Sequence, residues 1–200
     1  MRLLGIGLGL AYLIGAIPVG FIVARFFGGG DIRRSGSGSI GATNVLRTLG
    51  TLPAVVTLFG DIAKGYLAVS VARALGPARW GAAAGAVLAI VGNCWPVFIR
   101  FHGGKGVATG FGAFLALTPL ATAPTVLVWL AVTASFRYVS LASIMACVCL
   151  PVGVALLGYP WPSIAAAAAA AIVIIGRHRE NLWRLATGSE PRLGERASPA

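Results

Sequence analysis

The chain has 200 residues, of which 58% are hydrophobic and only 10% are charged. A water-soluble domain carries about a quarter charged residues, so this composition excludes a soluble fold, and it also excludes disorder, collagen and a coiled coil. The sequence therefore predicts a single all-α integral membrane domain over residues 1–200. The formal net charge is +11, which we relate to membrane topology and anionic ligands rather than to nucleic acid.

The first half of the chain contains three uncharged or nearly uncharged stretches of spanning length. A membrane helix needs about 20 apolar residues, and residues 3–24, 52–75 and 80–99 each provide them. The second stretch is interrupted by Asp61 and Lys64. Each of the three is predicted to be one membrane span.

The second half contains two longer uncharged stretches. Residues 106–136 are too many for one span and too few for two full ones. Prolines near the middle disfavour a continuous helix, so two short helices with a turn at 118–124 are predicted. Residues 139–176 divide into two spans at the aromatic turn 158–162. The total is seven transmembrane helices, two of them short, or five if the short pair does not fully cross.

The distribution of Lys and Arg predicts the orientation of these spans. With seven spans, twelve cations collect on one side and three on the other. The twelve are Arg25, Arg33, Arg34, Arg47, Arg100, Lys105, Arg137, Arg177, Arg179, Arg184, Arg192 and Arg196, against Arg2, Arg73 and Arg79. The positive-inside rule then places the N-terminus outside and the C-terminus in the cytoplasm. A loose tail is expected from about residue 189.

A glycine-rich segment on the predicted cytoplasmic side is the first candidate ligand site. Residues 36–47 read GSGSIGATNVLR, and glycines among hydroxyl residues allow successive N–H groups to line a concavity that suits phosphate. Its candidate phosphate ligands are Gly36, Ser37, Gly38, Gly41, Thr43, Asn44 and Arg47. The alternative is a flexible juxtamembrane linker, and the P-loop signature is absent because no terminal Lys-Ser/Thr follows.

The second candidate segment, residues 101–109, reads FHGGKGVAT. Lys105 lies among Gly103, Gly104 and Gly106 just before a predicted helix. An ammonium group, bare amides and the helix dipole can therefore converge on one anion. The alternative is an ordinary lysine that follows the positive-inside rule.

The third candidate segment follows the last predicted span and contains His178 and Asn181, three residues apart on one helix face. The alternative role, contact with lipid head groups, suits the neighbouring Arg179, Trp183 and Arg184.

Two weaker features lie inside the spans. Asp61 and Lys64 are one helical turn apart, which suggests either a structural ion pair or a substrate contact. Ser140 and Ser143 follow Arg137 and either face the same site or bond their own backbone. Acidic residues near the loops are too few for a metal cage, so neither a metal nor another cofactor is expected.

The three glycine-rich and polar segments resemble the three motifs of the bacterial acyl-phosphate:glycerol-3-phosphate acyltransferase family of inner-membrane proteins. The resemblance covers residues 36–47, 101–109 and 177–190, with similar family segments at 61–65 and 139–143. Three positions depart from the usual family pattern: Ser39 replaces an asparagine, Asn93 a histidine and His102 a lysine.

The resemblance implies transfer of a fatty acyl group from acyl phosphate to the 1-hydroxyl of sn-glycerol 3-phosphate, in phospholipid synthesis. The residues that it implies in catalysis are Ser37, Arg47, Lys105, His178 and Asn181, with the glycines, Thr43, Asn44 and Ser143 as further substrate contacts. It also implies a multi-pass protein of the bacterial inner membrane with the acyl chain between the spans, a cytoplasmic active site, and a soluble acyl-phosphate-producing enzyme as a candidate partner.

Two questions about function stay open from the sequence. The hydroxyl proton could pass to His178, whose type titrates near neutrality, or to the substrate phosphate, which we favour because acyl phosphate is already activated. The competing class is a transporter or channel for a phosphorylated metabolite, which would place polar residues near the membrane midplane.

Overall fold

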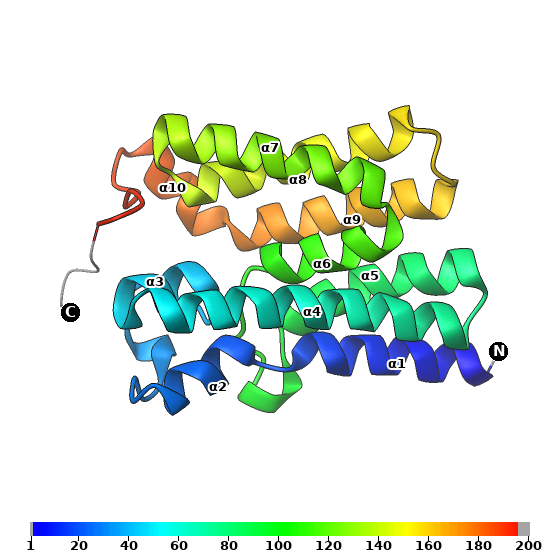
Figure 1. The fold of residues 1–200 in the computed structure, drawn as a ribbon, viewed down its shortest axis with the longest axis horizontal. Helices are drawn as coiled ribbons and strands as arrows, with labels where there is room; N and C mark the ends of the chain where they lie inside the picture. Colours follow the sequence, from blue (N-terminus) through cyan, green and yellow to red (C-terminus); the bar gives the residue numbers. More distant parts are fainter. Residues whose placement is uncertain (1, 196–200) are drawn as a thin grey trace.

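The computed structural model describes residues 2–195, and every regular element in that range is helical (Figure 1). Its α-helices are α1 (Arg2–Ala16), α2 (Val19–Phe26), α3 (Ala42–Leu49), α4 (Thr51–Leu75), α5 (Ala78–Cys94), α6 (Val107–Leu117), α7 (Pro119–Phe136), α8 (Val139–Leu156), α9 (Trp161–Arg177) and α10 (Arg179–Ala186). Two short 3₁₀ helices, η1 (Ile32–Arg34) and η2 (Val97–Ile99), lie in the connections.

The long helices form two groups with α6 between them. Helices α1, α4 and α5 pack against one another on one side, and on the other side α8 packs against both α7 and α9 (Figure 1). Helix α9 also packs against α5. Helix α6 contacts α4 and α5 as well as α7 and α9. The short helices α2, α3 and α10 gather at the same end of the bundle as the described C-terminal residues (Figure 1).

Small residues allow the central helices to approach closely. A Cβ on Gly65 of α4 would lie 2.0 Å from the Thr109 carbonyl oxygen, and one on Gly112 of α6 would lie 1.9 Å from the Ile62 carbonyl oxygen. Side chains at these two glycines would therefore push α4 and α6 apart. Contacts between backbones at small residues are a usual way for helices to associate inside a membrane.

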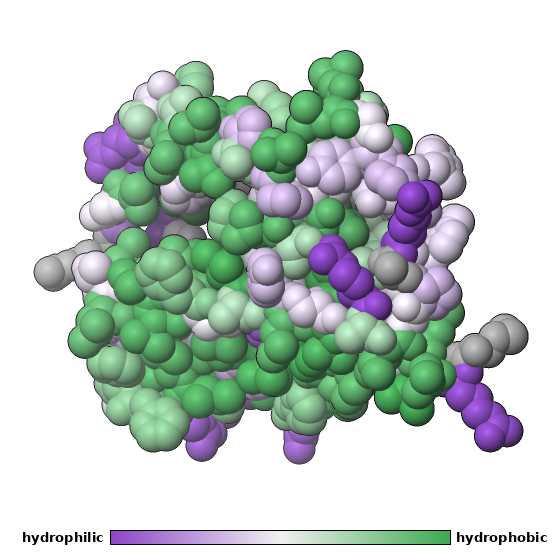
Figure 2. All heavy atoms as spheres, turned by 45° about the vertical axis from the view of Figure 1, so that its right-hand side comes forward, coloured by the Kyte–Doolittle hydropathy of each residue, from purple (hydrophilic) through white to green (hydrophobic). Residues whose placement is uncertain are grey.

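The outer surface of the bundle is apolar. Figure 2 shows a face on which hydrophobic side chains predominate. Large side chains such as Phe59, Leu127, Leu156 and Ile172 are each at least 65% exposed. Monomeric soluble proteins rarely expose such continuous apolar surface, so this surface is suited to lipid.

The predicted spans agree closely with the observed helices. Five helical segments are long and apolar enough to cross a membrane, α9 and α10 form a sixth candidate bent by 60°, and α6 is a shorter apolar helix. The prediction of an all-α membrane protein is therefore confirmed. The count of seven spans and the direction of the termini stay predictions.

The break in residues 106–136 is narrower than the predicted turn at 118–124. Only Thr118 separates α6 from α7, and Pro119 is the first residue of α7 while Pro124 lies inside it. The first helical position suits proline because its missing N–H has no partner in a helix. The observed turn is therefore Thr118 alone, and the rest of the predicted turn belongs to α7.

Candidate active site

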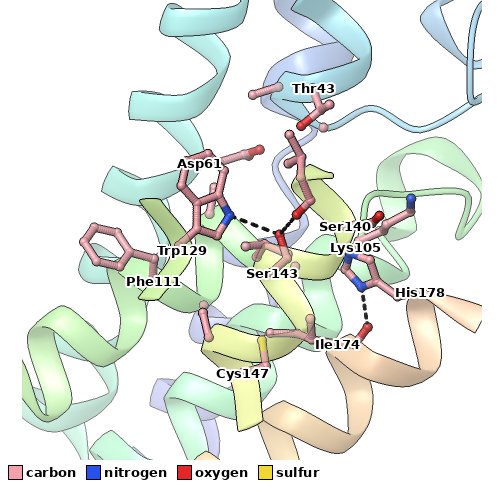
Figure 3. A pocket seen from close by; sticks show the side chains of 18 of the residues that line it. Thr43, Asp61, Lys105, Phe111, Trp129, Ser140, Ser143, Cys147, Ile174 and His178 are labelled. Carbon is pink, nitrogen blue, oxygen red and sulfur yellow. Dashed lines mark hydrogen bonds between the residues drawn. The ribbon is translucent and has the colours of Figure 1, made fainter. Parts of the chain in front are cut away.

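One cavity of about 350 Å³ brings the three candidate segments together. It is lined by residues from all three segments, which lie far apart in the sequence: Ser37, Arg47, Lys105, His178 and Asn181. The cavity continues along apolar side chains of the central helices. Figure 3 shows Lys105, Ser140 and His178 on one side of it and Phe111, Trp129 and Cys147 on the other. The cavity thus has a polar part and an apolar part.

Asn44 shapes the first segment from within. Its Nδ2 donates to the carbonyl oxygens of Ser39 (2.8 Å) and Ser35 (3.0 Å), and its Oδ1 accepts from the Ser37 N–H (2.9 Å). Gly36 has φ +57°, and a Cβ there would lie 2.3 Å from Asn44 Oδ1. Although Asn44 lines the cavity, its polar atoms are committed to this turn, so we now assign it to holding the loop rather than to binding phosphate.

The backbone amides of this segment are also engaged internally. The Gly38 N–H donates to the Ser35 carbonyl oxygen and the Gly41 N–H to Ser39 Oγ. Neither Gly36 nor Gly38 lines the cavity. Of the predicted glycines, Gly41 does line the cavity, at the start of α3. The segment therefore offers the Ser37 hydroxyl and the first turn of α3, while the amides of Ser37, Gly38 and Gly41 are engaged within the loop.

Helix α3 presents Thr43 and Arg47 to the cavity. The Arg47 Nη2 donates to the Pro191 carbonyl oxygen (3.1 Å). Its buried Nε has no hydrogen-bond partner within residues 2–195. A buried N–H of a cation without a partner is costly, and an anion in the cavity would satisfy it.

Lys105 occupies the entrance to α6. Its Nζ donates to Asn181 Oδ1 (2.5 Å), and burial lowers the pKa of Lys105 to about 8. Gly106, Val107 and Ala108 line the cavity beside it. The first N–H groups of a helix have no partner within that helix, so the start of α6 adds a positive dipole end to the Lys105 charge. Gly103 and Gly104 do not line the cavity.

His178 lies at the bend between α9 and α10 and is 3% exposed. Its Nδ1 is 2.7 Å from the Ile174 carbonyl oxygen (Figure 3). Because a carbonyl only accepts, Nδ1 carries the proton and the neutral ring has its lone pair at Nε2. Burial lowers the pKa of His178 to about 4, so the ring is a hydrogen-bond acceptor at neutral pH.

Glu190 completes the polar part of the cavity, and it was absent from the predicted site. Its Oε1 accepts from Ser140 Oγ and Asn181 Nδ2, both at 2.7 Å, and its Oε2 accepts from Arg184 Nε (2.8 Å). Burial raises the pKa of Glu190, but these hydrogen bonds outweigh it and lower the pKa overall. The ionised carboxylate orients Asn181, which in turn contacts Lys105.

The position of Glu190 also changes the expectation of a loose tail from about residue 189. Glu190 is 7% exposed and tied to α8 and α10. The Leu193 N–H donates to the Arg137 carbonyl oxygen (2.7 Å). The tail therefore begins as an ordered part of the site, and residues 196–200, including Arg196, lie outside the described range.

Ser143 lines the cavity but its hydroxyl is occupied. It donates to the Val139 carbonyl oxygen (2.7 Å) and accepts from Trp129 Nε1 (3.3 Å) (Figure 3). Ser143 therefore faces the site and also bonds its own backbone, and its hydroxyl joins α7 to α8 instead of offering a free donor to a substrate.

The three positions that depart from the family pattern have different surroundings. Ser39 Oγ accepts from the Gly41 N–H within the first segment (3.3 Å). Asn93 is buried, lines the cavity and accepts from Lys64. His102 is exposed and does not line the cavity. Ser39 also lines the cavity, so Ser39 and Asn93 are both placed to influence the site and His102 is not.

Comparison with known proteins gives one consistent result. The family model described as glycerol-3-phosphate acyltransferase matches residues 6–188. The chain is 48% identical to glycerol-3-phosphate acyltransferase 2 of Moorella thermoacetica, over 94% of this chain and 96% of that one. It is 50% identical to a glycerol-3-phosphate acyltransferase of Thermus thermophilus, over 94% of each chain.

Solved structures give the same result. The chain resembles crystal structures of PlsY (YgiH), an integral membrane glycerol 3-phosphate acyltransferase. The glycerol 3-phosphate form superposes with a TM-score of 0.91 at 38% identity over 96% of both chains. The lysophosphatidic acid form superposes with a TM-score of 0.88 at 37% identity, over 96% of this chain and 95% of that one.

Proposed function

This chain belongs to the glycerol-3-phosphate acyltransferase family, and we propose that it transfers a fatty acyl group from acyl phosphate to the 1-hydroxyl of sn-glycerol 3-phosphate. The product is 1-acyl-glycerol 3-phosphate, an intermediate of phospholipid synthesis. The observation that carries the proposal is the single cavity in which Arg47 and Lys105 share a lining with the apolar side chains of α6 to α9. Such a cavity suits a product with a phosphate at one end and an acyl chain at the other.

The cationic groups at the polar part of the cavity bind the substrate phosphates. Arg47 offers a half-buried guanidinium whose Nε has no hydrogen-bond partner within residues 2–195, and Lys105 offers an ammonium at the start of α6. Charge-assisted hydrogen bonds to phosphate oxygens are about twice as strong as neutral ones. Ser37 and Thr43 add hydroxyl donors at the same side, and Asn181 holds the Lys105 ammonium in place.

In the reaction, the 1-hydroxyl oxygen attacks the acyl carbonyl carbon and the bond from that carbon to the phosphate oxygen breaks. His178 Nε2 accepts a hydrogen bond from the hydroxyl and orients it. With a pKa of about 4, the ring is a weak base at neutral pH. The released inorganic phosphate is a stronger base than the ring, because phosphate groups titrate nearer neutrality, with a second pKa of about 6 even in monoesters. Since a base works best near the operating pH, the departing phosphate takes the proton.

The cationic groups also stabilise the charge that develops during transfer. Negative charge moves from the carbonyl oxygen to the leaving phosphate as the new ester forms. Fixed donors in a site that excludes water stabilise such charge without reorganisation.

The comparisons support this acyltransferase and not the transporter or channel considered from the sequence.

The choice of acyl donor tests the proposal. In matched detergent micelles, the purified protein should turn over palmitoyl phosphate with glycerol 3-phosphate and should not use palmitoyl-CoA. The reason is that the chain contains no His-x4-Asp pair and no adenine-nucleotide signature. Equal initial rates with both donors would reject acyl phosphate as the specific donor.

We further propose that the protein lies in the bacterial inner membrane with the polar part of the cavity towards the cytoplasm. Helices α2, α3 and α10, which carry arginines of the larger cationic group, gather at one end of the bundle (Figure 1). The positive-inside rule assigns that end to the cytoplasm. The soluble acyl-phosphate-producing enzyme stays a predicted partner at this face.

Cysteine labelling tests this orientation. In a background without native cysteines, Arg34→Cys and Arg179→Cys should react with a membrane-impermeant maleimide only after right-side-out vesicles are opened. Arg79→Cys should react in sealed vesicles, because its exposed side chain lies on the predicted outer side. The reverse labelling pattern would overturn the cytoplasmic assignment.

A further inference from the structure

A buried ion pair lies in α4, close to the cavity. The Lys64 ammonium is 2.7 Å from the Asp61 carboxylate, and both residues are 5% exposed. Charged groups inside a membrane helix are expensive and usually mark function. Asp61 lines the cavity, but Lys64 does not. Any contribution of Lys64 to the reaction must therefore pass through its neighbours.

The Lys64 ammonium joins the ends of two other helices. It donates to the Ile17 carbonyl oxygen (2.7 Å), just beyond α1, and to Asn93 Oδ1 (2.9 Å), in the last turn of α5. Two of the three ammonium protons are used in these hydrogen bonds, and the Asp61 carboxylate adds an ion pair. The ammonium is therefore held by fixed partners from three sides.

Asn93 in turn supports the turn that precedes Lys105. Its main-chain carbonyl oxygen accepts from the Gly104 N–H (3.0 Å). A Cβ on Gly103 would lie 2.2 Å from that carbonyl oxygen, and a Cβ on Gly104 would lie 3.0 Å from Asn93 Nδ2. The glycine pair thus lies directly against Asn93. Arg177 Nε donates to the Gly104 carbonyl oxygen (3.2 Å), so Gly104 is held through both its N–H and its carbonyl group.

We propose that Lys64, neutralised by Asp61, is a positioning residue for Lys105. Lys64 fixes Asn93, and Asn93 fixes the Gly103–Gly104 turn from which Lys105 reaches the cavity. This inference rests on the proposed function, because it assigns Lys64 a role in presenting the Lys105 ammonium to a substrate phosphate. A displacement of about 1 Å in a reacting group can cost a hundredfold in rate, so a remote support of this kind has a measurable effect.

A variant that removes the Asp61–Lys64 ion pair without leaving a buried charge tests this inference. The double variant Asp61→Asn/Lys64→Met avoids the large penalty of a lone buried ion. We expect kcat/KM for glycerol 3-phosphate to fall about tenfold. We also expect the alkaline limb of the kcat/KM profile to move to higher pH, because a displaced Lys105 regains water around its ammonium.

The matched control is Thr57→Val. Thr57 lies in the same helix, is 0% exposed, and donates to the Pro53 carbonyl oxygen (2.8 Å) without contacting the turn. The control should change thermal stability at most, and leave kcat/KM and its alkaline limb unchanged. A purely structural role for the Lys64 pair predicts the same behaviour for the double variant, so that result would overturn the inference.

A second pair of variants carries the test if the double variant does not fold. Asn93→Ala removes the side-chain acceptor for Lys64 and should lower kcat/KM by at least about threefold. Asn93→Asp keeps an acceptor and should restore most of the activity. Equal activity of both variants with wild type would contradict the inference. A wild-type protein that does not acylate glycerol 3-phosphate would instead refute the proposed function.

Discussion

Replacement of Lys105 with alanine is expected to lower kcat/KM for glycerol 3-phosphate about a hundredfold. A hydrogen bond to a charged group contributes about 1.5–3 kcal/mol, which corresponds to roughly tenfold to a hundredfold at 1.36 kcal/mol per decade. The loss lies at the upper end because Asn181 Oδ1, which accepts from the Lys105 ammonium, also loses its donor. Initial rates of the folded variant measure the effect.

Lys105→Arg should restore activity poorly. A planar guanidinium fork does not replace a compact ammonium, least of all between the Gly104 and Gly106 backbones. The exposed cation on α10 provides the control: Arg179→Ala removes the same formal charge from this end of the bundle, and its rate should stay within about twofold of wild type. A fully active Lys105→Ala would show that the start of α6 does not hold a substrate phosphate.

The pH profile provides an independent signature of Lys105. Its pKa of about 8 means that the ammonium is charged below that pH and neutral above it. The value of kcat/KM should therefore fall as the pH rises through about 8, since its pH dependence reports the pKa values of the free enzyme. The alkaline limb of the kcat profile should lie at higher pH, because a bound phosphate favours the charged form of Lys105. The alkaline limb should disappear in Lys105→Arg.

Replacement of His178 is expected to have the other large effect. His178→Ala removes the Nε2 acceptor that orients the 1-hydroxyl, and kcat should fall about a hundredfold, as expected when a reacting group loses its orientation. His178→Gln and His178→Asn should keep measurable activity, because an amide oxygen also accepts a hydrogen bond. Initial rates measured against pH for wild type and the three variants test this order of activities.

The shape of the profile separates orientation from base catalysis. With a pKa of about 4, His178 should contribute no limb between about pH 6 and pH 8, the range in which an unperturbed histidine titrates. If His178 were instead a base with a pKa close to the operating pH, wild type would lose activity on the acid side of neutrality. His178→Gln would then lack both that limb and measurable turnover, and the departing phosphate would not be the proton acceptor.

Most helices could be predicted from the sequence, because the length of an apolar stretch and the positions of its prolines determine where a helix begins and ends. The span predicted from 52–75 is α4 within one residue, and the predicted break at 158–162 separates α8 from α9. Helix α3 was harder to predict. Its residues resemble part of a glycine-rich loop, because eight helical residues between Gly41 and Gly50 are too few to establish a helical period from the sequence.

The site was predictable in its members and less so in their roles. Lys105 and Asn181 were both expected, but their contact spans 76 residues of sequence. Asn44 was expected to bind phosphate, and its amide is instead occupied by the loop. Glu190 ended the third segment, yet its burial depends on Ser140 and Arg184. Hydrogen-bond partners of this kind are set by tertiary packing, which no local pattern encodes.

The stoichiometry of transfer tests the central claim most directly. Purified protein, reconstituted in sealed vesicles, would receive labelled glycerol 3-phosphate and palmitoyl phosphate, and acyl product and inorganic phosphate would be measured together. The account predicts equal amounts of 1-acyl-glycerol 3-phosphate and phosphate, both dependent on glycerol 3-phosphate and both nearly abolished in Lys105→Ala. Uptake of glycerol 3-phosphate into the vesicles without acyl product, or release of phosphate without glycerol 3-phosphate, would contradict it.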